Sequence, residues 1–194
     1  MCSSDLALER LDVFGEGITD AGLASLIDLK NLKSLNFHHT RVTVPALIQF
    51  AARSPVAQIR ASFIDLASEV GGFAVNLNNP EQSAVLEGDI HELVIEQISA
   101  WSTLKRLRID AMSRVTDPGV RHLAALTDLE FLALQNGHRL SNDALQHLQG
   151  LARLKELSLF ACPNITDAGL AHLKSLTALE SLELGKTRVT DQGI

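Results

Sequence analysis

Hydrophobic residues recur along this chain in one pattern that repeats every 24 or 25 positions. In the segment LKELSLFACPNITDAGLAHLKSLTA, which begins at Leu154, leucines first occupy alternate positions and then every third position. Alternation is the period of a half-buried β-strand, and a spacing of three to four is the period of one helix face. Each unit therefore predicts a short strand followed by a short helix.

Two repeated strings show that the period extends along the whole chain. ITDAGLA at 18–24 returns at 165–171, and TRVT at 40–43 returns at 187–190, both at an offset of 147 residues. Fixed-period repetition of this kind indicates a solenoid, in which strands stack into one parallel sheet. We predict a single domain over 1–194 with about eight units, starting near 8, 32, 56, 80, 104, 129, 154 and 179.

The grid also predicts the place of each element. Val13, Phe37, Val85 and Leu159 fall in a column that should face the core. Thr–Asp pairs precede the helical spacing and should provide side-chain acceptors for the free N–H groups at each helix start: Thr19–Asp20, Thr116–Asp117 and Thr166–Asp167. Strands should be parallel in one sheet and centre near 11–13, 35–37, 107–109, 132–134, 157–159 and 182–184.

The units at 56 and 80 are degenerate. Gly71 and Pro80 occupy columns that elsewhere hold Leu, Ile or Val, and Gly71–Gly72 should weaken any helix there. Ile90 and Ile95 fall on the grid again. We therefore expect 62–89 to be an irregular stretch within one solenoid, and a hinge between two half-solenoids is the alternative.

Composition and charge indicate which cellular compartment and which class of partner to expect. The formal net charge is −6, which does not favour nucleic acid or an anionic membrane as the partner. Two distant cysteines, Cys2 and Cys162, do not form a disulfide framework, and the first residues lack the pattern of a secretory signal. No apolar run approaches the roughly 18 residues of a membrane span. These features predict a cytoplasmic protein.

The units resemble leucine-rich repeats over nearly the whole chain. ACPNITDAGLAHL is similar to the cysteine-containing class known from F-box-type adaptors, and TRVTD resembles units common in bacterial proteins. The resemblance implies an α/β fold, a right-handed horseshoe-shaped solenoid with a parallel concave β-sheet and short convex helices. It also implies that Thr40, Cys162 and Thr187 hydrogen-bond backbone groups at the turn after each strand, whereas Met112, Gly137 and Ile64 depart from that column.

Structural roles are the expectation for the candidate catalytic and metal-binding residues. His122, His147 and His172 share one column, but zinc needs ligand nitrogens about 2.0–2.1 Å from one ion, while neighbouring helices pack about 8–10 Å apart. Repeated surface histidines are therefore the expectation, with no metal. The adjacent His38 and His39 have Phe14, Gly15, Ser62 and Phe63 as grid neighbours, with Asp12 one column away, and polar residues of the binding face are the expectation rather than a catalytic pair. We expect no enzyme activity and no cofactor.

The remaining hypothesis is a protein–protein interaction module that binds a partner on its concave face. Side chains that alternate with the core leucines line this face, and exposed aromatics beside arginines are typical of interface hot spots. The alternative is a substrate-recognition segment of a larger, ubiquitin-ligase-like adaptor or of a multidomain enzyme. A structural alternative is that Arg106 only pairs with Glu156 or Asp110. The candidate partner-binding residues are His38, Arg60, Arg106, Arg108, Phe131, Glu156 and Phe160.

The last unit, LESLELGKTRVTDQGI, still carries the internal consensus. Solenoids normally end in a unit with a polar outer face. We therefore expect either a piece of a longer protein or end-to-end self-association through this unit.

Overall fold

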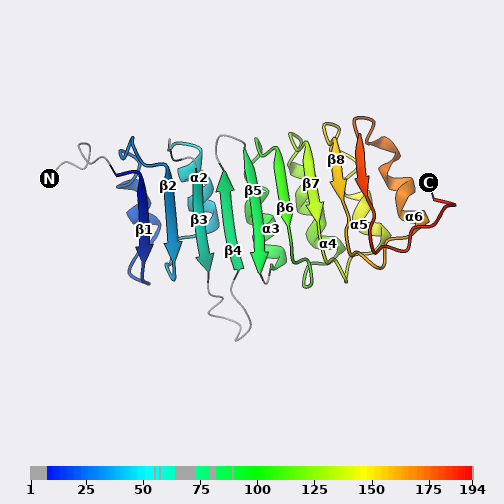
Figure 1. Cartoon of the computed structure of the whole chain (residues 1–194), viewed down its shortest axis with the longest axis horizontal. Coiled ribbons are helices and arrows are strands. Elements are labelled where there is room, and N and C mark those ends of the chain that lie inside the picture. Colours follow the sequence, from blue (N-terminus) through cyan, green and yellow to red (C-terminus); the bar gives the residue numbers. More distant parts are fainter. Residues whose placement is uncertain are drawn as a thin grey trace.

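The computed structural model describes residues 8–54, 56, 58–63, 73–78, 82–88 and 90–193. It is an α/β structure in which the described strands form one sheet in chain order, from β1 at one end to β9 at the other (Figure 1). The strands are β1 (Arg10–Phe14), β2 (Ser34–His38), β3 (Gln58–Phe63), β4 (Phe73–Asn78), β5 (Ser83–Gly88), β6 (Arg106–Ile109), β7 (Phe131–Leu134), β8 (Glu156–Ser158) and β9 (Ser181–Glu183).

Short helices lie behind the sheet in Figure 1, and the core fills the space between the two layers. The strand leucines and the helix leucines meet there, and Leu35, Leu107 and Leu132 are fully buried. The helices are α1 (Asp20–Ala24), α2 (Val44–Ala51), α3 (Glu92–Ile98), α4 (Asp117–Val120), α5 (Asn142–Gln146) and α6 (Asp167–Leu170), with 3-10 turns η2 (Arg121–Ala125) and η3 (Ala171–Ser175).

The strand positions predicted for the six regular units are confirmed. Leu11 pairs with Leu35 across β1 and β2, and Leu132 pairs with Leu157 across β7 and β8, so each unit repeats the register of its neighbour. The sheet contains two parallel blocks. β1–β3 form the N-terminal block, and β5–β9 form the C-terminal block.

β4 contradicts the prediction that all strands run parallel, because it is antiparallel to both β3 and β5. The physical reason is the length of the connection. Only four residues separate Asn78 from Ser83, whereas a parallel crossover needs a dozen or more. The predicted irregular stretch at 62–89 thus contains two regular strands. The predicted effect of Gly71–Gly72 falls outside the described residues.

β5 lies one residue out of the predicted register. Ala84 pairs with Leu107 and Leu86 with Ile109, so Leu86 is fully buried and Val85 lies on the opposite face, where the grid had placed it in the core. A slip of one residue exchanges the two faces of a strand. Burying Ala84 and Leu86 keeps an apolar pair on the core side. The unit therefore starts at 81.

The backbone conformation supports the same slip. Asn136, Ala161 and Lys186 share one column just after their strands, and all three have positive φ, between 58° and 59°. Gly88 has a φ of 90° and falls into that column only if its unit starts at 81. Glycine adopts this conformation without steric cost, which suits the last residue of β5.

The predicted Thr–Asp helix caps act differently from the prediction. Thr19, Thr116 and Thr166 are the N-cap residues, but their side chains make no capping hydrogen bond. Instead, the aspartate that follows each threonine reaches the next unit. Asp20 accepts hydrogen bonds from the backbone N–H of Thr43 at 2.7 Å and from its hydroxyl at 3.0 Å.

This interunit hydrogen bond recurs along the helix layer. Asp117 accepts hydrogen bonds from the backbone N–H and the hydroxyl of Ser141. Asp167 accepts from the same two groups of Thr190, and each of these two bonds is 2.7 Å long. Asn142 accepts from the N–H of Thr166 at 3.0 Å. The two Thr190 bonds lower the pKa of Asp167, the backbone bond more than the hydroxyl bond. Residues expected to cap one helix therefore tie consecutive units together.

The helix layer and the sheet advance at different rates around β4. α2 follows β2 and α3 follows β5, yet α2 packs directly against α3. The sheet thus advances by three strands, about 14 Å at 4.7–4.9 Å per strand, while the helix layer advances by one helix of about 8–10 Å. Elsewhere in the described chain, β1, β2 and β5–β8 are each followed by one helix.

Candidate functional site

The face of the sheet opposite the helices, here called the open face, presents the predicted binding residues. In β6, Arg106 and Arg108 are exposed and Leu107 and Ile109 are buried, as the alternation predicted. Arg60 is exposed on β3, and His38 lies at the end of β2. These side chains stand on a scaffold of paired strands, so their spacing is set by the sheet.

Arg106, Phe131 and Glu156 form a row across three neighbouring strands, here called the central row. They are backbone partners in the register. The guanidinium carbon of Arg106 lies 4.3 Å from the centroid of the Phe131 ring, and its Nη1 lies 3.7 Å from Oε1 of Glu156. The Arg106–Glu156 pair that the structural alternative invoked is therefore present, together with a cation–π contact.

Arg108 lies beside the central row and is also paired. Its Nε donates to Oδ1 of Asp110 at 2.5 Å. This hydrogen bond, with the charges of Asp110 and Glu87, raises the pKa of Arg108. The side chain keeps about half of its surface exposed, at 49%. It remains accessible to a partner that brings a carboxylate.

Phe160 lies at another level of the open face. Phe131 is level with Glu156, and Phe160 is four residues further along, about 13 Å at 3.3 Å per residue. The structure therefore does not unite the two phenylalanines in one patch. Lys186 Nζ lies 4.9 Å from the centroid of the Phe160 ring. A Cβ on Gly185 would come within 2.9 Å of that ring, so the glycine lets Phe160 lie over the residues that follow β9.

A second cluster on the open face, at β1 and β2, was not among the predicted residues except for His38. The His38 ring stacks on Phe14 with centroids 4.8 Å apart and planes 17° apart. Asn36 Nδ2 donates to Oδ1 of Asp12 at 2.5 Å, and Arg10 Nε donates to Oδ2 of Asp12 at 3.1 Å. These bonds, first from Asn36 and then from Arg10, lower the pKa of Asp12. The sequence signal was Asp12, Asn36 and Phe14 in outward columns.

Cys162 and Thr187 make backbone hydrogen bonds of the kind that the sequence led us to expect. The Cys162 thiol donates to the carbonyl of Leu134 at 3.4 Å, and the Thr187 hydroxyl donates to that of Leu184 at 2.7 Å. Burial raises the pKa of Cys162, which disfavours the nucleophilic thiolate. Gly137 provides the space beside Cys162, since a Cβ there would lie 2.9 Å from Sγ.

The column of histidines lies on the helix side. His172 Nδ1 is 3.2 Å from Nε2 of Gln149, a contact between neighbouring units. In the part of the chain that the structure describes, no group of three or more His, Cys, Asp or Glu side chains could hold a metal ion.

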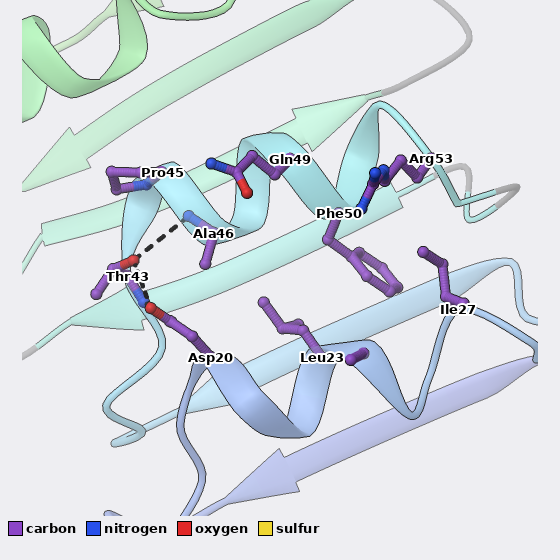
Figure 2. Close-up of a pocket in the computed structure, with 10 residues that line it drawn as sticks. Asp20, Leu23, Ile27, Thr43, Pro45, Ala46, Gln49, Phe50 and Arg53 are labelled. Carbon is purple, nitrogen blue, oxygen red and sulfur yellow. Dashed lines mark hydrogen bonds between the residues drawn. The ribbon is translucent and has the colours of Figure 1, made fainter.

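Two open grooves also lie outside the open face. The first, of about 530 Å³, runs between α1 and α2, with Leu23, Ile27 and Phe50 along its floor and Arg53 at one end (Figure 2). Its other end holds Asp20, already bonded to Thr43. The second, of about 570 Å³, lies between α6–η3 and the end of β9. The lining of either groove contains no cysteine or histidine, so neither presents a nucleophile with an imidazole base.

No protein-family model and no curated protein sequence matches the chain significantly. Of the helices in the described part of the chain, none is long and apolar enough to cross a membrane. The arrangement of side chains on the open face is therefore the basis for assigning a function.

Proposed function

We propose that the chain is a leucine-rich-repeat solenoid that acts as a non-enzymatic, cytoplasmic protein-interaction module, with its partner bound on the open face. The central row carries this proposal. It places an arginine, an aromatic ring and a carboxylate side by side on three paired strands. Arginine and aromatic residues are the types enriched at binding hot spots.

The energetics of the central row suit recognition better than stability. Arg106 and Glu156 have side-chain exposures of 45% and 49%, and exposed ion pairs contribute only about 0–1 kcal/mol. The pair therefore does little for folding. Its contact with Phe131 holds the guanidinium in place, which reduces the entropy that a partner must remove on binding. A partner that covers the row would exclude water and strengthen both interactions.

The test is co-purification with the whole chain as bait, followed by mass spectrometry of the captured proteins. Capture should be lost or weakened in Phe131→Ala and Arg108→Ala, each by about 2 kcal/mol or more of binding free energy. His147→Ala, on the helix side, is the control and should capture normally. If the control loses capture while both open-face variants retain it, the binding surface lies on the helix side and the proposal is wrong. Recovery of ubiquitin-ligase subunits would specify the narrower adaptor role.

A further inference from the structure

We propose that Asp12, Phe14, Asn36 and His38, here called the N-terminal cluster, form a binding site for an arginine side chain of the partner. This inference rests on the proposed function, because it names one chemical feature of what the open face binds. The four residues are two pairs of backbone partners on β1 and β2, Asp12 with Asn36 and Phe14 with His38. All four belong to the face opposite the core.

The orientation of Asn36 provides the first argument. Asp12 has a lowered pKa and is an ionised carboxylate at neutral pH, so it can only accept hydrogen bonds. The amide nitrogen of Asn36 must therefore face Asp12, to which it donates at 2.5 Å. The amide oxygen is thereby turned away from Asp12. It is buried without a hydrogen-bond partner among the described residues, and Asn36 is only 6% exposed. A buried acceptor without a donor is costly, so a donor that reaches it is favoured.

The exposed ring of Phe14 provides the second argument. Phe14 is 66% exposed, which is unusual for a large apolar side chain, and one side of its ring stacks on His38. The other side is available to a flat cation. A guanidinium stacks on aromatic rings and carries five N–H donors in a rigid fork, whereas an ammonium is a point charge. One arginine could thus stack on Phe14 while it donates to Asp12, and a shift of the Asn36 side chain would bring its buried oxygen within reach of the same fork.

The chain itself shows that this carboxylate accepts a guanidinium. Arg10 lies two residues before Asp12 and donates to it through Nε at 3.1 Å. The Arg10 side chain is 70% exposed, so a partner that offers further contacts can displace it. Arg60 is the competing donor, because it is the backbone partner of Asn36 on β3. Both resident arginines can be removed by substitution.

The experiment is an NMR titration of the isotope-labelled whole chain with N-acetyl-arginine amide and, separately, with its neutral isostere N-acetyl-citrulline amide. The arginine compound should produce saturable shifts of the Asn36 side-chain amide and of His38, and the citrulline compound should not. Asp12→Asn and Phe14→Ala should each weaken the response at least about tenfold, which is 1.4 kcal/mol. Arg10→Gln should strengthen it by freeing Asp12. Asp128→Asn removes a carboxylate paired with an arginine elsewhere and should leave the response unchanged.

Equal responses to the two compounds, no saturable shift, or an unchanged response in Asp12→Asn would each overturn the proposal. If Arg60→Gln alone creates the response, Arg60 is the natural donor to Asn36 and the site is internal to the chain, which also overturns it. The outcome is separate from that of the proposed function. A partner captured through Phe131 and Arg108 but indifferent to Asp12→Asn would refute the arginine site alone.

Discussion

The N-terminal and C-terminal blocks are built from the same unit, but the edge strand β1 buries that unit less completely than the internal strand β7. In the C-terminal block, Leu132 and Leu134 are fully buried, because strands lie on both sides of β7. In the N-terminal block, Leu11 and Val13 of β1 are only partly buried. The helices differ as well. α2 has eight residues, whereas α4 and α6 have four and continue as 3-10 turns.

This difference shows that the repeat alone does not determine local stability. A unit is stable when both of its neighbours bury its columns, which is the expected behaviour of a repeat protein. β4 interrupts this neighbour-to-neighbour packing in the middle of the sheet, where the sheet advances by three strands while the helix layer advances by one helix. Edge and internal strands should therefore respond differently to equivalent substitutions.

The largest contrast is expected for leucine truncation in an internal strand and in an edge strand. Leu132→Ala should lower the free energy of unfolding by about 2–5 kcal/mol, because it leaves a cavity in a fully enclosed column. Leu11→Ala, in the same column of β1, should cost about half as much, since that side chain is already partly exposed. Denaturant unfolding of both variants measures the two costs. Equal costs would show that burial in β1 is as complete as in β7.

Glycine substitution should show a contrast of intermediate size. Gly137→Ala places a methyl group against Leu140 and Cys162 and should cost about 1–3 kcal/mol of unfolding free energy. Gly17→Ala, in the N-terminal block, has open space around it and should cost little.

A double variant separates the causes of that cost. Cys162→Ala combined with Gly137→Ala should recover part of it, because the thiol no longer occupies the space. Strictly additive effects in the double-mutant cycle would argue that the added methyl group clashes with Leu140 instead.

The interunit hydrogen bonds should make the C-terminal block sensitive to acid. The lowered pKa of Asp167 means that its carboxylate stabilises the fold at pH values above its unfolded pKa of about 3.9, and that this contribution is lost as the pH falls through the lower folded pKa. Asp167→Asn should therefore be less stable than the parent at pH 7, and the gap should narrow as the pH falls below about 4. Unfolding curves at several pH values measure the gap. A gap that stays constant with pH would contradict the role of the charge.

The smallest effect is expected for contact between the two ends of the sheet. Stacking β9 of one copy on β1 of another, in the register of the internal strands, would place Glu183 beside Asp12. Like charges repel. The distance over which they interact, the screening length, falls from about 30 Å at 0.01 M salt to about 3 Å at 1 M. Self-association should therefore be weak and should increase with salt in sedimentation velocity. Glu183→Lys should increase it at low salt, while Glu96→Lys, on α3, should not.

Much of the fold could be predicted from the leucine grid, because strand and helix periods are local properties of the chain. The alternation around Leu35 and around Leu132 was sufficient to predict β2 and β7. The prediction was wrong at Val85, because counting by a constant period cannot detect a unit that starts one residue late. It was also wrong for β4, where no leucine pattern exists and the short connection before β5 decides the direction.

The candidate site was predictable only in part. The grid identified Arg106, Phe131 and Glu156 as outward and placed them on adjacent strands, and these are the residues that the structure brings together. It did not predict that the Thr–Asp pairs join neighbouring units, because the short-range capping rule has a competitor 23 or 24 residues away. It also did not separate Phe131 from Phe160.

The sequence by itself determined the unit, its period and which face of each regular strand is buried, since these depend on the spacing of apolar residues along the chain. Only the tertiary structure decided the direction of β4, the register of β5 and the pairing of polar side chains on the open face. Those features depend on the free energy of contacts between residues far apart in the sequence. The amide of Asn36 illustrates the difference: its place in an outward column follows from counting, but its unpaired oxygen follows from the presence of Asp12 on the neighbouring strand.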